Sequence, residues 1–183
     1  DPKKSASEQL ADVLRDRSAE EYGTGTKIEG LVRLSGGANR ENWSFDAVKP
    51  DGTRQPLILK RDPMDRQLEK QYEGLPEGRL TVTRLTEGRL FQLAREAGVP
   101  MPRVPFFLEN DQRTTEGFFS HRLAGEALGR RIVRDEAHAR ARSKLAFQVG
   151  HAAARFHGID LETLPPLRGL PATEELLHYR TIM

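Results

Sequence analysis

The residues best suited to bind a charged ligand lie in a short apolar segment that ends in a lysine. Residues 57–61 read Leu-Ile-Leu-Lys-Arg, and Asp62-Pro63 then interrupts the run. The pattern predicts a β-strand, and side chains alternate between the faces of a strand, so Ile58 and Lys60 point to the same side. An apolar side chain beside an ammonium group suits a ligand with a flat ring at one end and phosphates at the other. Taken alone, a lysine that closes a strand is more commonly a solvated edge residue.

A second candidate element is the polar turn 35–40, Ser-Gly-Gly-Ala-Asn-Arg. Adjacent glycines let the backbone approach a phosphate and expose its amide groups. An asparagine tolerates left-handed geometry, and the arginine that follows is long enough to reach a phosphate. The candidate phosphate-binding residues of this turn are Ser35, Gly36, Gly37, Asn39 and Arg40. An ordinary hairpin turn is the alternative, because the turn lacks the G-x-G-x-x-G pattern.

Composition narrows the class of protein. The 183 residues are 37% hydrophobic and 31% charged, with a formal net charge of +2 and no cysteine. Disulfides and thiolate metal sites are therefore excluded, and the histidines lack metal-ligand spacing. Basic residues form no run long enough for a nucleic-acid footprint, and no apolar run has the length of a membrane span. We expect a cytoplasmic protein that binds neither nucleic acid nor membrane.

Hydrophobic periodicity predicts one helix and three strands in the first sixty residues. Ser5 and Glu8 have the spacing of a capping box, so a helix should run from residue 6 to about residue 17, with Gly23 as a breaker. The period then changes to two, which predicts strands at residues 31–34, 43–47 and 57–61. Pro-Asp-Gly at residues 50–52 is a strong turn signal. Short turns between the strands predict an antiparallel meander.

The remaining residues predict a helix, two strands and then helices only. Residues 65–79 lack a clear period and are interpreted as a loop. A helix should open after Thr83 and run to about residue 97, with Gly98 after it. Its expected apolar face consists of Leu90, Leu93, Ala94 and Ala97. Strands should follow at 104–108 and 117–123, and helices at 127–134, at 139–156 and from residue 174.

Five short motifs occur in order between residues 28 and 160. They are the turn and strand at 34–46, the strand at 57–63, and the segments 87–102, 118–126 and 153–160. In this order and spacing they resemble the aminoglycoside phosphotransferase (APH) and choline-kinase-like family, and more narrowly its branch of kinase-like domains associated with acyl-CoA dehydrogenases. The resemblance implies an α+β fold. A protein-kinase-like small lobe, with a five-stranded antiparallel sheet and one helix, would precede the first helices of a helical large lobe.

The resemblance also implies roles for particular residues. In kinase-like folds the lysine of the third strand holds nucleotide phosphates, and a glutamate on the next helix orients it, which assigns these roles to Lys60 and Glu87. Ile58 would face the nucleotide. Residues 120–123 would form the hinge, where backbone groups near His121 and Leu123 meet the adenine edge. The side chain of His121 is interpreted as a hinge surface residue. For Glu87 alone, a carboxylate favourable to the helix dipole is the alternative reading.

The catalytic loop of the family is His-Gly-Asp with an asparagine five positions after the aspartate. Residues 157–160 read His-Gly-Ile-Asp, and Pro165 stands five positions after Asp160, so we interpret this segment as the end of a helix. No catalytic residue is therefore assigned in the chain. Mg²⁺ ligands are expected outside it. The chain is expected to be the amino-terminal part of a longer enzyme and to be inactive alone.

The sequence therefore predicts an ATP-dependent phosphotransferase, with ATP and Mg²⁺ as cofactors and a hydroxyl of a small molecule as acceptor. Its other partner would be the remainder of the large lobe. The expected domains are an amino-terminal helical extension (1–26), a nucleotide-binding small lobe (27–123), and the linker and start of the large lobe (124–183). The alternatives are a non-catalytic nucleotide-binding pseudokinase module and an α+β interaction domain that binds no nucleotide.

Overall fold

The computed structural model describes residues 5–35, 40–63, 82–165, 167, 173, 174, 176, 177 and 180. Gly36, Gly37 and Asn39 of the predicted phosphate turn lie outside the described residues. The predicted loop at 65–79 lies outside them as well.

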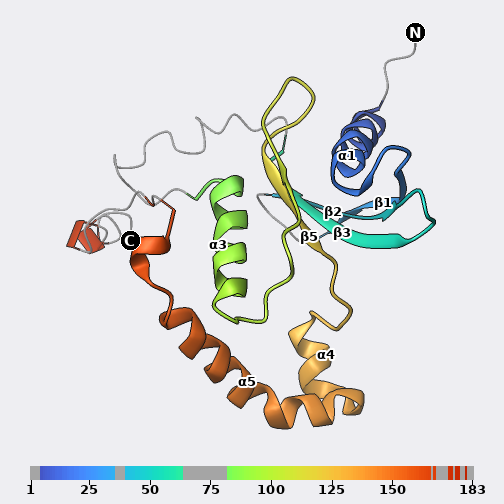
Figure 1. Ribbon diagram of the computed structural model, residues 1–183. Helices are drawn as coiled ribbons and strands as arrows, with labels where there is room; N and C mark the ends of the chain where they lie inside the picture. The colour runs from blue at the N-terminus through green and yellow to red at the C-terminus, as the bar shows by residue number, and fades with distance from the viewer. Residues whose placement is uncertain are drawn as a thin grey trace.

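The centre of the fold is a five-stranded sheet, as predicted (Figure 1). Its strands in chain order are β1 (Lys27–Leu34), β2 (Glu41–Val48), β3 (Arg54–Arg61), β4 (Phe107–Leu108) and β5 (Gly117–His121). They lie in the spatial order β1-β2-β3-β5-β4, and each neighbouring pair is antiparallel. The last strand along the chain thus lies between the third and the fourth, beside the strand that carries Lys60.

Turn chemistry sets the register of the first strands. Gly52 has a φ of 84°, which L-residues rarely adopt, and its N–H donates to the carbonyl of Lys49 at 2.9 Å. This turn aligns β2 with β3 so that Ser44 pairs with Ile58 and Asn42 with Lys60. Strand β4 is shorter than the predicted 104–108, because Pro105 has no N–H to donate to a ladder.

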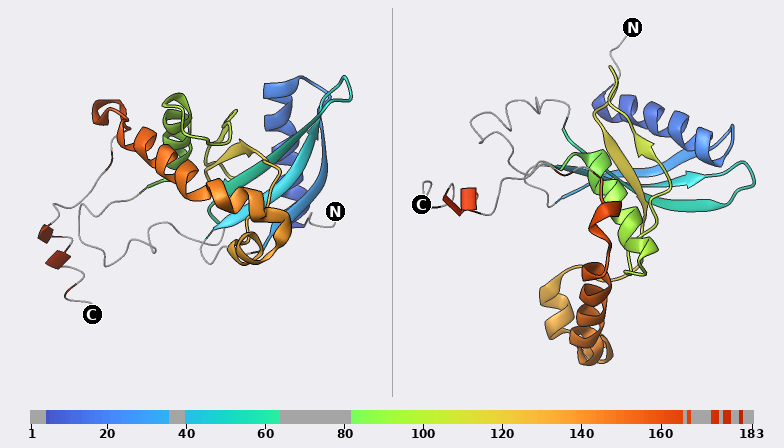
Figure 2. Two further views of the ribbon diagram at one scale, coloured as in Figure 1. Left: turned by 90° about the horizontal axis from the view of Figure 1, so that it is seen from below. Right: turned by 60° about the vertical axis from the view of Figure 1, so that its left-hand side comes forward.

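Helix α1 (Ala6–Tyr22) covers one face of the sheet (Figure 2). The predicted capping box is present, with the Ser5 amide donating to Glu8 Oε2 at 2.7 Å. The helix ends at Gly23, so it is longer than the predicted 6–17, and nothing between these positions interrupts it. Its apolar stripe packs on the inner side chains of the sheet. The resulting buried core contains Leu10, Val13, Leu14, Phe45, Ala47, Leu57, Leu59, Leu108 and Phe119.

Helix α3 (Arg84–Glu96) covers the opposite face. Thr83 caps it by accepting from the amide of Thr86 at 3.2 Å, which confirms the predicted start. Its packing face differs from the prediction. Ala94 is buried as expected, but the other buried positions are Arg84 and Gly88, and Leu90 and Leu93 are only half-buried. Gly88 was not predicted as a contact because it has no side chain to contribute to an apolar pattern.

Where the structure describes the chain after β5, its regular elements are all helical, as predicted. It contains α4 (Gly129–Arg134), a 3₁₀ turn (Glu136–His138), α5 (Ala139–His157) and a second 3₁₀ turn (Leu161–Thr163). Helices α4 and α5 extend away from the sheet, and the end of α5 returns to α3, where Arg155 Nη1 donates to the carbonyl of Gly98 at 2.5 Å (Figures 1 and 2). None of the helices described here is long and apolar enough to span a membrane.

Candidate functional site

Strand β3 separates its side chains as its sequence predicts. Leu57 and Leu59 are fully buried under α1, while Ile58 and Lys60 lie on the face that α3 covers. On that face Lys60 lies between Asn42 of β2 and Phe118 of β5, because both residues pair with it in register. The shared face of Ile58 and Lys60 is therefore confirmed.

Lys60 and Glu87 form an ion pair, although 27 positions separate them in the sequence. The Nζ atom of Lys60 lies 2.7 Å from Oε1 of Glu87. It also lies 5.5 Å and 5.6 Å from the ring centres of Phe91 and Phe118, which surround the ammonium group with aromatic faces. The Lys60 side chain is 27% exposed, so the ammonium is held in place and remains accessible from one side.

The second carboxylate oxygen of Glu87 faces two arginines. Arg84 donates to it from one turn earlier on the helix, and Arg40 Nη1 lies 3.5 Å away. The side chain of Arg84 is only 2% exposed, and its Nε also lies 3.5 Å from Oδ1 of Asp62. Among the described residues at this corner of the molecule, three cations thus lie close to the carboxylates of Glu87 and Asp62, and the Glu116 carboxylate accepts from the Arg84 amide at 2.8 Å.

Burial and the neighbouring arginines change the titration of the lysine. Burial, followed by the positive charges of Arg40 and Arg84, lowers the pKa of Lys60 from its ordinary 10.5. An anion that enters this corner would oppose both effects, because it stabilises the charged ammonium.

A second ionic cluster holds the ends of the strands that flank the polar turn. Oε2 of Glu41 accepts from Nε of Arg61 at 3.0 Å and from the indole of Trp43 at 3.1 Å. Oε1 of the same carboxylate lies 3.2 Å from Arg33. These contacts tie β1, β2 and β3 together beside the turn, and they fix the start of β2 directly after Arg40. Ser35 and Arg40 are the described members of the predicted phosphate turn.

The predicted hinge lies at the end of β5. Its His121 pairs with Leu57, so its side chain is on the face opposite Lys60 and cannot line the same site. The His121 amide donates to the carbonyl of Arg103 at 2.9 Å. Burial, followed by the positive charges of Arg103, Arg95 and Lys49, lowers the pKa of its imidazole. Leu123 is 66% exposed, and its amide has no acceptor among the described residues.

Arg84 is the residue of this site that sequence reasoning missed. It precedes Glu87 by three positions on α3, a spacing at which opposite charges meet on a helix. That spacing was a usable signal. It was not distinctive, because three-residue spacings of opposite charge occur elsewhere in the chain, as in the pairs Arg15–Asp12 and Arg17–Glu20.

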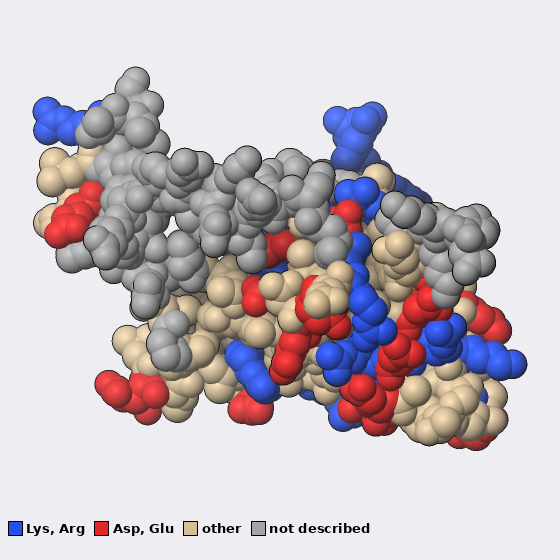
Figure 3. All heavy atoms as spheres, turned by 90° about the horizontal axis from the view of Figure 1, so that it is seen from above, with Lys and Arg blue, Asp and Glu red and all other residues tan. Residues whose placement is uncertain are grey.

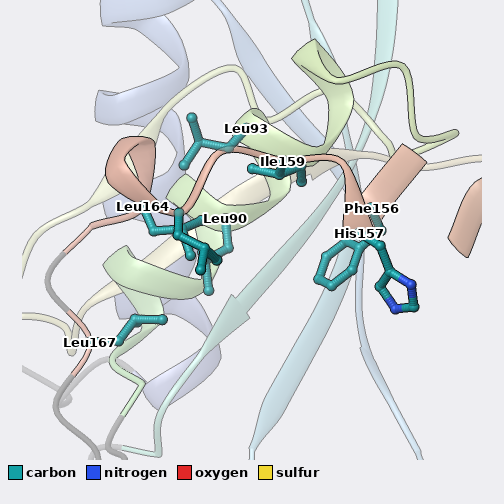
Figure 4. A pocket seen from close by; sticks show the side chains of 8 residues that line it. Leu90, Leu93, Phe156, His157, Ile159, Leu164 and Leu167 are labelled. Atoms are coloured by element: carbon teal, nitrogen blue, oxygen red, sulfur yellow. The ribbon is translucent and has the colours of Figure 1, made fainter. Parts of the chain in front are cut away.

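An apolar cavity of about 400 Å³ lies on the other side of α3 (Figure 4). Leu90 and Leu93 of α3 face the end of α5 and the segment that follows it. The remaining lining residues are Phe156, His157, Ile159, Leu161, Leu164 and Leu167. Only one of them, His157, is titratable, so this cavity lacks the paired charges found at Lys60.

Residues 157–160 end a helix, as interpreted from the sequence. Helix α5 stops at His157, Gly158 follows as its cap, and Asp160 accepts from the amide of Glu162 at 3.0 Å.

Across the described part of the chain, no group of three His, Cys, Asp or Glu side chains is arranged to hold a metal ion. Acidic and basic side chains lie next to one another on the face shown in Figure 3.

Comparison with known proteins identifies the family of the chain. A search of curated proteins gave no match. The family model of the phosphotransferase enzyme family, APH, matches residues 33–181, which is most of the chain, so the chain belongs to this family.

Proposed function

We propose that this chain carries the nucleotide-binding part of an ATP-dependent phosphotransferase whose acceptor is a hydroxyl of a small molecule. The observation that carries the proposal is the Lys60–Glu87 pair, whose atoms are 2.7 Å apart, with the Arg40 and Arg84 side chains beside it. Membership of a phosphotransferase family supports the reaction class. The use of ATP and the nature of the acceptor are our inference from this corner and from the resemblance.

The residues present fit the two ends of a nucleotide. Lys60 and Arg40 would hold phosphate oxygens, with the turn that contains Ser35, Gly36, Gly37 and Asn39 contributing amides. Ile58 would lie against the base. The base edge would meet backbone groups of the hinge, with the carbonyl of His121 and the amide of Leu123 as the proposed contacts. Bound ATP would supply the phosphoryl group that is transferred.

Glu87 would fix the position of Lys60 while leaving part of the ammonium accessible to a phosphate. A carboxylate paired with a lysine orients it through charge-assisted hydrogen bonds, which are stronger than neutral ones. Arg84 would add positive charge from a buried position without contacting the ligand. We assign no Mg²⁺ ligand and no proton acceptor to the described residues. The proposed division of the chain places the nucleotide-binding lobe at 27–123, with residues 1–26 before it and 124–183 after it.

Calorimetric titration of the chain tests the proposal. We expect ATP to bind measurably and adenosine to bind far more weakly, because Lys60 and Arg40 contact only the phosphates. Inorganic tripolyphosphate should retain part of the affinity of ATP. Absence of ATP binding at millimolar concentration would contradict the proposal and favour an α+β interaction domain.

The affinity for ATP should also decrease at alkaline pH. Phosphate binding requires the protonated form of Lys60, and the pKa of this group lies below its ordinary 10.5 in the folded protein. Affinity should therefore be lost as the pH rises through this lowered pKa, earlier than for a solvated lysine. The same pKa shift affects the stability of the fold with the opposite dependence on pH. Between the folded and unfolded pKa values the unfolded chain binds more protons, so Lys60 increases stability as the pH rises. Titrations from pH 7 upward, with Lys60→Arg as the control, measure the effect on affinity.

A further inference from the structure

The side chain of Arg122 crosses the sheet on the same face as Lys60. Its backbone amide, just after β5, donates to the carbonyl of Pro56 on β3 at 3.0 Å. Its guanidinium donates from Nη1 to Oγ of Ser44 at 2.6 Å and from Nη2 to Oδ1 of Asp46 at 2.7 Å, both on β2. Strand β3 lies between β5 and β2, so the side chain must pass over it.

The register of the strands locates the guanidinium. Ser44 pairs with Ile58, and Asp46 pairs with Pro56. A group bonded to both therefore lies over β3 at the level of Pro56 and Ile58. Lys60 lies two positions beyond Ile58 on the same face, about 7 Å further along the strand. The face thus carries a cationic plane at one end, an ammonium at the other, and an apolar side chain between them.

Neutralisation of Asp46 does not account for this arrangement. Oδ2 of that carboxylate already lies 3.6 Å from Arg54, which in turn pairs with Glu29 at 2.6 Å. The Arg122 side chain is 39% exposed, and ion pairs of this exposure contribute little to stability. What the contacts do achieve is to fix the guanidinium, because two acceptors hold its two terminal nitrogens.

A fixed guanidinium is a good surface for a nucleobase. It is planar, it keeps its charge across the accessible pH range, and it stacks on aromatic rings. Hydrogen bonds to Ser44 and Asp46 use its N–H groups in the plane, so the flat face directed away from β3 is the one that could stack on a ring.

We propose that Arg122 binds the nucleobase: its guanidinium, held by Ser44 and Asp46, stacks on the purine ring beside Ile58. This inference rests on the proposed function, because it assumes that a nucleotide occupies the face of Lys60. It adds a side-chain contact from within the predicted hinge, residues 120–123, to the backbone contacts that were proposed there for the base edge.

The test compares ATP with inorganic tripolyphosphate, which has no base. Arg122→Gln should weaken ATP binding about three- to tenfold, as expected for loss of a cation–π contact, and leave tripolyphosphate binding nearly unchanged. Arg122→Lys keeps the charge but loses the plane, so it should give a similar loss for ATP. Arg54→Gln is the matched control: it removes the same charge and also loses a contact with Asp46, and it should affect neither ligand by more than about twofold.

The outcomes separate this inference from the proposed function. If wild-type chain binds ATP and both Arg122 variants bind it equally well, Arg122 does not contact the base, and the proposed function still stands. Equal losses for ATP and tripolyphosphate would also overturn the inference, because only the charge would then matter. If wild-type chain binds tripolyphosphate but gains nothing from the adenosine part of ATP, the base site is wrong. Failure to bind either ligand would overturn the proposed function itself.

Discussion

Replacing Lys60 with methionine should weaken ATP binding by about 10- to 100-fold, because a hydrogen bond to a charged group is typically worth about 1.5–3 kcal/mol. Methionine keeps most of the apolar stem that lies between Phe91 and Phe118. The free energy of unfolding should change by no more than about 1 kcal/mol, since the lost pair with Glu87 is offset by relief of the repulsion between Lys60 and the arginines Arg40 and Arg84. Calorimetric titration and thermal unfolding of the same variant measure the two effects.

Two companion variants make this prediction specific. Lys60→Arg keeps a cation on the strand and should retain more ATP affinity than Lys60→Met. Glu87→Gln should act mainly on stability, lowering it by about 1–3 kcal/mol, because it leaves the buried Arg84, 2% exposed, with less compensating charge. Wild-type ATP affinity in Lys60→Met would mean that this lysine is a solvated strand end, and the nucleotide site would have to lie elsewhere.

Local patterns were sufficient to predict most of the sheet. Alternation of apolar and polar residues is a property of a single strand, so residues 57–61 revealed which of their side chains share a face. The turn at 50–52 likewise depends on residues that are adjacent in sequence. The exact ends were less predictable, because strand ends depend on pairing. Strand β3 begins at Arg54, where β2 supplies partners, and β5 ends at His121.

The ion pair at the centre of the site is a different case. No local pattern links Lys60 to Glu87, since the contact depends on how α3 is placed on the sheet. Resemblance to a family suggested the pair, and the structure brings the two groups together. Arg84 and Arg122 were missed for a related reason. Each is one arginine among many in the sequence, and only the tertiary structure distinguishes those that converge on this face.

The packing face of α3 shows a further limit of hydrophobic patterns. The apolar residues Leu90 and Leu93 predicted the side that meets the sheet, yet they line the cavity toward α5. Sheet contact occurs instead at Gly88, where the helix backbone approaches two phenylalanine rings closely. A hydrophobic pattern is defined by large apolar side chains. It therefore does not detect a contact at Gly88 that depends on the lack of a side chain.

Gly88→Ala should destabilise the protein by about 1–3 kcal/mol, the usual cost of forcing an extra methyl group into a packed interface. A Cβ at this position would lie 2.5 Å from Cε1 of Phe107 and 2.9 Å from Cβ and Cγ of Phe118. The Phe107 ring can move at its far end. The atoms of Phe118 are next to the backbone of β5, and that side chain is only 1% exposed, so the helix itself must shift.

The matched control is Gly150→Ala, which makes the same substitution inside helix α5. A Cβ there would meet nothing within 4 Å, so the change should stabilise by up to about 1 kcal/mol through helix propensity alone. Opposite signs for the two variants in chemical denaturation would identify close packing at Gly88 as the cause. Because Glu87 is adjacent to Gly88, a shift of α3 should also weaken its contact with Lys60 and reduce ATP affinity. If Gly88→Ala were as stabilising as Gly150→Ala, α3 could not lie as close to β5 as the structure has it.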